Sequence, residues 1–378
     1  MKENKIENIV LNEPVVEYED LSSGVLMEKP FNPTKIDITT KALTIDLLIK
    51  RLKADPIEID LSPEFQRRGD LWDEQKQSQL IESLLIKFPL PAFYFDGSDN
   101  NKWLIVDGLQ RLSSLRNFVI LKKLKLKGLE FLTKLEGFGF DDLPRNLQRQ
   151  IEEAQITAYI INPGTPEEVK FNIFKRINTG GLILNSQEIR HALNQGIPAT
   201  FVAELSELKA FKEATGNAIK SNRMLDREFV TRFIAFYLQP HTEYVPDLDT
   251  FMNRAMCDIK KLNVQQRDKI KSNFTNSMKL TKKIFDSWAF RKTDKHPVKK
   301  KPINKAIFEV WSVLLAKLDD DNRVKLEHKK QILFEKWVNL NKYDSVFFDS
   351  ITTSTGNRLC VIERFSKIDK IIKETLQP

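Results

Sequence analysis

The sequence contains little cysteine and histidine, and neither residue is spaced for a structural metal site. Its two cysteines, Cys257 and Cys360, are too few for a disulfide framework, so we expect a protein of the reducing cytoplasm. The cysteines and the four histidines form no CxxC or HxxxH pattern, which argues against a structural zinc site.

Long apolar runs are also missing. No stretch approaches the roughly 18 consecutive apolar residues of a membrane-spanning helix, so we expect no membrane span and no membrane contact. Residues 1–20 contain no hydrophobic region of the kind found in secretory signal peptides.

Several catalytic signatures are absent. The Gly-x-x-x-x-Gly-Lys-Ser/Thr motif of P-loop NTPases and the Gly-x-Ser-x-Gly motif of serine hydrolases do not occur. Pro246-Asp247 followed by Asp258-Ile259-Lys260 imitates a restriction-nuclease motif. Asp258, however, lies in a helical apolar pattern, where that fold needs a strand. We therefore expect any DNA cleavage to come from a partner.

The chain is long enough for two domains and is mildly basic. Its 378 residues exceed the roughly 250–300 that one hydrophobic core serves. A formal charge of +8 is compatible with nucleic acid without establishing it. We predict an acidic, poorly ordered or loosely docked lead-in at 1–33, a mixed α/β domain at 34–195 and an all-helical domain at 196–378. The predicted fold class is therefore α+β.

Local patterns predict the elements of the α/β domain. Thr44 begins a helix that Pro56 ends, and Asp73 caps a helix whose apolar face includes Phe88. The expected strands lie in 57–61, 93–95, 102–106 and 156–161, the middle two forming a hairpin. After about residue 196 almost every periodic segment is helical, as in 248–259, 307–318 and 361–372.

The turn at Asp107-Gly108 is the most informative feature. An apolar run, 103–106, ends there, and a helical pattern with Leu112 and Leu115 on one face begins. Glycine permits a sharp turn and close approach of a ligand. The free N–H groups and dipole at a helix start favour an anion, and Arg111 offers a forked donor. The pattern predicts a phosphate-binding turn. A plain strand–helix connection with a surface arginine would have the same sequence pattern.

Three motifs occur in a recognisable order: Phe65-Gln66-Arg67, the segment 107–112 (Asp-Gly-Leu-Gln-Arg-Leu), and the segment 174–190 with Asn178-Thr179-Gly180-Gly181. Together they resemble the N-terminal-domain family of the GmrSD restriction endonucleases, in the ParB/sulfiredoxin-like superfamily. The resemblance covers about residues 40–195. It indicates a stand-alone member that lacks an HNH nuclease domain.

This resemblance implies a ParB/sulfiredoxin-like nucleotide-binding core. In the family an Asp-Gly-Gln-Gln-Arg signature handles phosphates and is linked to NTP hydrolysis, and the domain serves bacterial defence against phage or foreign DNA. Asp107, Gly108, Gln110 and Arg111 match the signature, but Leu109 stands where the family usually has glutamine. Leucine forms no hydrogen bond, so hydrolysis stays open while phosphate binding is expected.

The candidate roles follow from these matches. The candidate catalytic residues are Asp107, Gln110 and Arg111, and the candidate phosphate- or nucleotide-binding residues are Gln66, Arg67, Gly108, Arg111 and Asn178. Asp107 either holds a Mg²⁺ that rides on the phosphates or caps the next helix. Arg67 is favoured as a second clamp over a surface ion pair. Gln110 either contacts the ligand or lies on the surface, and Asn178 either contacts a base or sugar or belongs to a helix end.

A basic segment adds a candidate DNA contact. Residues 291–305 contain seven Lys or Arg and one Asp, including Lys299, Lys300 and Lys301. This segment either follows a DNA backbone or forms a solvated linker. The expected ligands and partners are a nucleoside triphosphate with Mg²⁺, DNA and a separate nuclease subunit, and homo-oligomerisation stays open.

The leading hypothesis is an NTP-binding sensor or regulatory component of a bacterial defence system. The alternatives are a ParB-like DNA-binding adaptor without NTP chemistry and a non-catalytic interaction scaffold.

Overall fold

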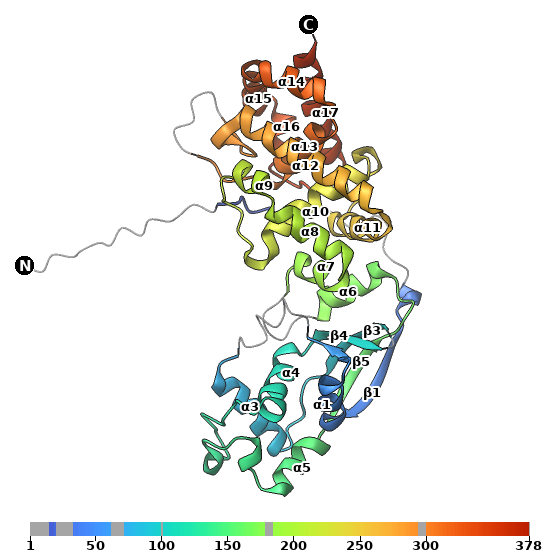
Figure 1. Cartoon of the computed structure of the whole chain (residues 1–378), viewed down its shortest axis with the longest axis vertical. Coiled ribbons are helices and arrows are strands. Elements are labelled where there is room, and N and C mark those ends of the chain that lie inside the picture. Colours follow the sequence, from blue (N-terminus) through green and yellow to red (C-terminus); the bar gives the residue numbers. More distant parts are fainter. Residues whose placement is uncertain are drawn as a thin grey trace, which may run out of the picture. The chain divides into compact units, whose positions relative to one another are not determined.

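The computed structural model describes residues 15–19, 33–61, 72–99, 101–177, 184–293 and 300–377. The chain divides into two compact units (Figure 1). The α/β unit comprises Phe31–Asn185, and the helical unit comprises Ser186–Pro378 together with Met1–Pro30. The α/β unit is therefore inserted into the sequence of the helical unit.

The α/β unit is built on a mixed sheet with the strand order β1-β5-β3-β4-β2. The pairs β1/β5 and β3/β4 are antiparallel, whereas β3/β5 and β2/β4 are parallel. The hairpin predicted around residues 96–101 is the β3/β4 pair. The strands are β1 (Ile38–Thr44), β2 (Ile59–Asp60), β3 (Phe93–Asp99), β4 (Lys102–Asp107) and β5 (Gln155–Ile161).

Helices pack against both faces of this sheet. Successive strand residues point to opposite faces, and Phe93 and Phe95 enter a hydrophobic core formed with α1, α3, α4 and α5. On the opposite face the buried Asp96 lies 3.8 Å from Lys170 of α6. The helices are α1 (Ile45–Lys53), α3 (Glu74–Leu85), α4 (Leu109–Leu115), α5 (Arg145–Glu153) and α6 (Glu167–Ile177), and the short helical turns are η1 (Pro33–Lys35), η2 (Arg116–Ile120), η3 (Thr133–Leu135) and η4 (Phe140–Asp142).

The helical unit packs its helices around a core rich in aromatic residues, in which Phe233, Phe274 and Trp311 are buried. No described helix is long and apolar enough to cross a membrane. Its helices are α7 (Ser186–Leu193), α8 (Ile197–Glu207), α9 (Lys209–Ala214), α10 (Leu225–Leu238), α11 (Leu248–Lys261), α12 (Val264–Phe285), α13 (Lys305–Ala316), α14 (Asp320–His328), α15 (Lys330–Tyr343), α16 (Ser345–Ser350) and α17 (Arg358–Leu376), with the 3₁₀ turns η5 (Asn222–Met224), η6 (His241–Glu243) and η7 (Asp286–Trp288). The predicted α+β class, with a mixed core followed by helices, is confirmed.

The structure places the unit boundary ten residues earlier than the predicted 195/196 division. Helix α7 packs on α10 and α11. The buried Arg190 donates to Asp249 (2.9 Å) and Asn253 (2.9 Å) in α11, and Gln187 donates to Thr231 in α10 (3.1 Å). Of the predicted lead-in at 1–33, the structure describes residues 15–19 and residue 33. Residues 15–19 lie against the helical unit, where only 8% of the Glu19 side chain is exposed.

The two predicted helix starts at Thr44 and Asp73 are confirmed, and one burial prediction is wrong. Thr44 accepts from the N–H of Leu47 at the start of α1, and Asp73 accepts from the N–H of Lys76 at the start of α3. Phe88 was expected on the buried face of the latter helix but is 57% exposed. The helix ends first, because Lys87 adopts a left-handed φ of 61° and the Phe88 N–H bonds back to the Ser83 carbonyl.

Candidate functional site

A cavity of about 810 Å³ lies beside the β4–α4 turn, within the size range of ligand pockets. Each described residue that lines it belongs to the α/β unit. It is lined from α3 by Lys76, Gln79, Leu80 and Ser83, from the segment that follows by Phe88, Pro89, Leu90, Pro91 and Ala92, and elsewhere by Trp72, Tyr94, Asp107, Arg111, Arg176 and Ile177. The described lining thus carries three cations and one carboxylate.

Asp107 and Arg111 form an ion pair at the wall of this cavity. The Arg111 Nη2 lies 3.0 Å from Asp107 Oδ2, one helical turn away along the chain. Nη2 also donates to the Ala92 carbonyl (3.2 Å) and Nη1 to the Pro91 carbonyl. The guanidinium stacks on Phe93 at 4.5 Å. Arg111 therefore ties the start of β3 to α4.

Three of the five N–H groups of Arg111 are used by these bonds. The Nε–H and one Nη1–H have no acceptor among the described residues. Burial raises the pKa of the Asp107 carboxyl, although the Arg111 charge opposes this shift. Burial likewise lowers the pKa of Arg111 against the pull of Asp107. The pair is partly desolvated, so a ligand that reaches it meets weakly hydrated charges.

Gly108 is required by its backbone conformation and by its neighbour. It is the N-cap of α4 with a left-handed φ of 99°, which favours glycine. An added Cβ would lie 2.6 Å from Cδ1 of Phe93. Gly108 is not among the residues that line the cavity, so the close approach that the structure displays is to the Phe93 ring.

Gln110 and Leu109 are not among the described residues that line the cavity. The Gln110 Oε1 accepts from the N–H of Trp72 at 3.2 Å, and Trp72 lines the cavity. Leu109 packs on the hydrophobic core of the α/β unit. The position that distinguishes this motif from the family signature thus faces the core.

Lys76 and Arg176 are cavity residues to which the sequence analysis assigned no role. Both side chains are exposed at the cavity, and neither forms an ion pair with another residue that the structure describes. Lys76 lies on the first turn of α3, and Arg176 is the penultimate residue of α6. Arg176 is part of the third motif, which was a usable signal, whereas nothing in the sequence distinguishes Lys76.

Four predicted site residues, Gln66, Arg67, Asn178 and Lys299, lie outside the described residues. Two of them are near cavity residues in sequence: Asn178 directly follows Ile177, and Arg67 precedes Trp72 by five positions. Lys300 and Lys301 are exposed. They belong to the helical unit, where the Lys301 carbonyl accepts from Arg291.

The one carboxylate of the described cavity lining is that of Asp107. Within the described ranges no three His, Cys, Asp or Glu side chains gather as a metal site. The residues therefore fit a Mg²⁺ that one carboxylate and ligand phosphates would hold jointly, and they do not fit a metal site made wholly of protein side chains.

Of the comparisons with known proteins, the one against family models matches the α/β part of the chain. Residues 48–195 match the family model described as GmrSD restriction endonuclease, N-terminal domain. This span contains the sheet from β2 to β5, the cavity and all three motifs. Neither a curated protein nor a solved structure matches the chain.

Proposed function

We propose that this chain is a nucleotide-binding regulatory component of a restriction system. The premise is that residues 48–195 belong to the GmrSD restriction endonuclease N-terminal domain family. The family membership implies a part in restriction or defence. The observation that carries the finer proposal is the cavity beside the β4–α4 turn, where Asp107, Arg111, Lys76 and Arg176 meet. A nucleoside triphosphate has the size and the charge that such a cavity accommodates.

Each charged group has a role in this proposal. Lys76 and Arg176 contact phosphate oxygens, because neither pairs with a carboxylate among the described residues, and Arg111 adds its remaining N–H groups. Asp107 would hold a Mg²⁺, which neutralises phosphate charge when bound. Tyr94, whose ring stacks on Tyr159 at 4.8 Å, supplies an aromatic wall.

Calorimetric titration with the common NTPs and dNTPs, with and without Mg²⁺, tests this proposal. We expect saturable binding by the wild type and about tenfold weaker binding by Lys76→Gln and by Arg176→Gln, since each loses a charged hydrogen bond worth about 1.5 kcal/mol. Lys134→Gln, an exposed lysine of η3 outside the cavity, is the control and should bind like the wild type. Equal affinity of all four proteins, or no binding, would refute the site.

A phosphate-release assay on the same mixtures of protein and nucleotide separates binding from turnover. Phosphate release by the wild type that Asp107→Asn abolishes would identify hydrolysis. Binding without release would identify a sensor whose response depends on occupancy, in keeping with the core-facing Leu109.

A DNA-binding adaptor is the second candidate, and a cation cluster favours it. Burial lowers the pKa of Lys300, and the nearby Arg291 and Lys282 lower it further, as expected where like charges gather. Arg291 is buried and Lys282 pairs with Asp286, so the exposed Lys300 and Lys301 are the cations of this region that would contact a phosphate backbone. Gel-shift titrations over a range of salt concentrations, with and without NTP, distinguish the two functions. A salt-dependent affinity that NTP leaves unchanged would support the adaptor.

We also propose that the chain does not cut DNA by itself. Asp258 lies in helix α11 with Lys260 and Lys261, so the Asp258-Ile259-Lys260 segment lacks the strand geometry of a restriction nuclease. A separate nuclease subunit is the partner that this proposal requires. Incubating the purified chain with DNA and Mg²⁺ tests it, and DNA cleavage by the chain alone would overturn it.

A further inference from the structure

Residues 15–19 lie as an extended segment on the helical unit. Val16 forms a parallel β-bridge with Ile303. The Ile303 N–H donates to the Val15 carbonyl (3.0 Å), and the Glu17 N–H donates to the Ile303 carbonyl (2.8 Å). Main-chain pairing of this kind is how many proteins bind an extended peptide.

The side chains of residues 17–19 alternate between protein and solvent. Tyr18 is 86% exposed, whereas its two neighbours face the protein. Glu17 pairs with Lys292 (2.6 Å) and accepts from Asn304 Nδ2 (2.9 Å). The groove, meaning the surface of the helical unit that contacts residues 15–19, thus binds carboxylates at alternate positions, which is the period of an extended chain.

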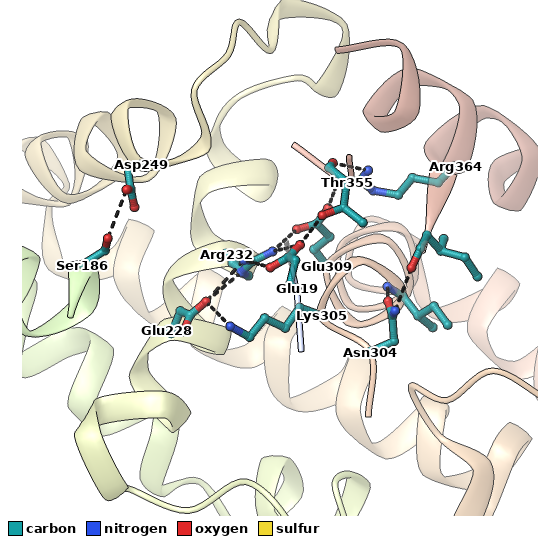
Figure 2. A network of polar contacts seen from close by, with 12 residues as sticks. Glu19, Ser186, Glu228, Arg232, Asp249, Asn304, Lys305, Glu309, Thr355 and Arg364 are labelled. Atoms are coloured by element: carbon teal, nitrogen blue, oxygen red, sulfur yellow. Dashed lines mark hydrogen bonds and ion pairs between the residues drawn. The ribbon is translucent and has the colours of Figure 1, made fainter. Parts of the chain in front are cut away.

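Glu19 enters a buried polar cluster around Arg232 and Glu309 (Figure 2). Both of its oxygens accept from Arg232, and Thr355 donates a further hydrogen bond. Arg232 also contacts Glu228 and Glu309, each at 3.3 Å or less. The bidentate guanidinium–carboxylate geometry is the strongest form of this contact.

The charges of this cluster balance only when Glu19 is present. The helices supply three cations, Arg232, Lys305 and Arg364, and two carboxylates, Glu228 and Glu309. Glu19 is the third carboxylate. Without it the buried cluster carries one uncompensated positive charge, which is costly at this depth.

We propose that residues 15–19 are a releasable intramolecular ligand, and that the groove they fill is a binding site for an extended peptide with carboxylates at positions i and i+2. Two backbone hydrogen bonds, the packing of Val16 on the hydrophobic core and a set of ion pairs hold the segment. A peptide that replaces it must therefore bring carboxylates that compensate the same buried cations. The α/β unit lies between this segment and α7 in the sequence, so the chain joins it to the helical unit at both ends. Release of the segment removes one of these two attachments.

The test of this proposal is to cleave the folded chain at one site. A specific protease site is inserted between Gly24 and Val25 in the full-length protein, which folds before it is cut. We expect the N-terminal fragment to co-elute with the rest at low salt and to exchange for a fluorescent peptide of residues 12–23 as salt is raised. Anisotropy of the labelled peptide reports the exchange.

Peptide variants identify what the groove recognises. Glu19→Gln should weaken peptide binding roughly a hundredfold, since it breaks a buried charge pair, and Tyr18→Ala should leave it unchanged. Three results would overturn the proposal: immediate loss of the fragment at low salt, a fragment that never exchanges, or equal binding of the Glu19→Gln and Tyr18→Ala peptides.

Discussion

Gly108 shows how one residue sets the geometry of the site. Its left-handed backbone and the Phe93 ring exclude a side chain independently of each other. Gly108→Ala should therefore cost about 2–5 kcal/mol of unfolding free energy, the sum of backbone strain and overpacking. Chemical denaturation measures this loss.

Gly164 is a matched control for the backbone term. Its φ is 90°, and nothing lies within 4 Å of a Cβ added there. Gly164→Ala should cost only the strain, about 1–2 kcal/mol. If both variants lose the same amount, contact with Phe93 is not what requires glycine at position 108.

Glu82 makes a second residue-scale prediction. Its carboxylate accepts the N–H groups of Glu130 (3.0 Å), Phe131 (2.7 Å) and Leu132 (2.7 Å), which fixes that loop. Burial alone raises the pKa of the Glu82 carboxyl, but these three donors outweigh burial and hold its pKa below the usual value. Glu82→Gln should cost about 2–3 kcal/mol at neutral pH.

The sign of the pH dependence follows from this lowered pKa. A carboxyl with a lowered folded-state pKa stabilises the protein above its ordinary pKa, and this contribution falls as the pH drops through the folded-state value. The difference between wild type and Glu82→Gln should therefore shrink in acid. Glu130→Gln, an exposed neighbour, should change neither stability nor its pH profile. A gap that stays constant in acid would contradict this explanation.

At the scale of elements, the N-cap of α3 links stability to the site. Asp73 accepts from the Lys76 N–H at 2.8 Å, and the Lys76 side chain lines the cavity. Asp73→Ala should cost about 1 kcal/mol and weaken nucleotide binding, whereas Asp73→Asn keeps an equivalent cap. Thermal unfolding and calorimetry of the two variants test this link, and equal stability of both would remove it.

Local signals were enough to predict most elements of the α/β unit. Thr44 and Asp73 mark helix starts through their own side chains, and the hairpin follows from two β-prone runs around a turn. These features depend on neighbours in sequence. The end of α3 was missed because a left-handed residue other than glycine, Lys87, stops it.

The features of the site that the sequence did not predict depend on contacts between residues that are far apart in the chain. Arg111 bonds to carbonyls about twenty positions away, and Lys76 and Arg176 line the same cavity only because α3 and α6 both border it. No periodicity contains such information. The assignment of Arg111 as a phosphate clamp remains a prediction, and the structure adds a second role for it in holding β3 and α4 together.

At the scale of the whole molecule, a few buried charges connect distant parts of the helical unit. Glu309 of α13 contacts Arg232 of α10 and Arg364 of α17, and Arg364 also donates to the Thr355 carbonyl at 2.7 Å. Segments more than a hundred residues apart therefore share one electrostatic cluster. Glu19, from the predicted lead-in, belongs to it, a long-range contact that the charge and proline content of residues 1–33 did not predict.

A double-mutant cycle tests whether these charges act as one unit. Removing either partner alone, as in Glu309→Leu or Arg364→Met, leaves a buried charge short of its counterion and should cost about 3–5 kcal/mol. The double variant replaces the pair with apolar side chains, so it should lose less than the sum of the singles by about 1–3 kcal/mol. Denaturant unfolding of all four proteins measures this coupling. Strict additivity would show that the two side chains stabilise the helical unit independently, through packing and not through their charges.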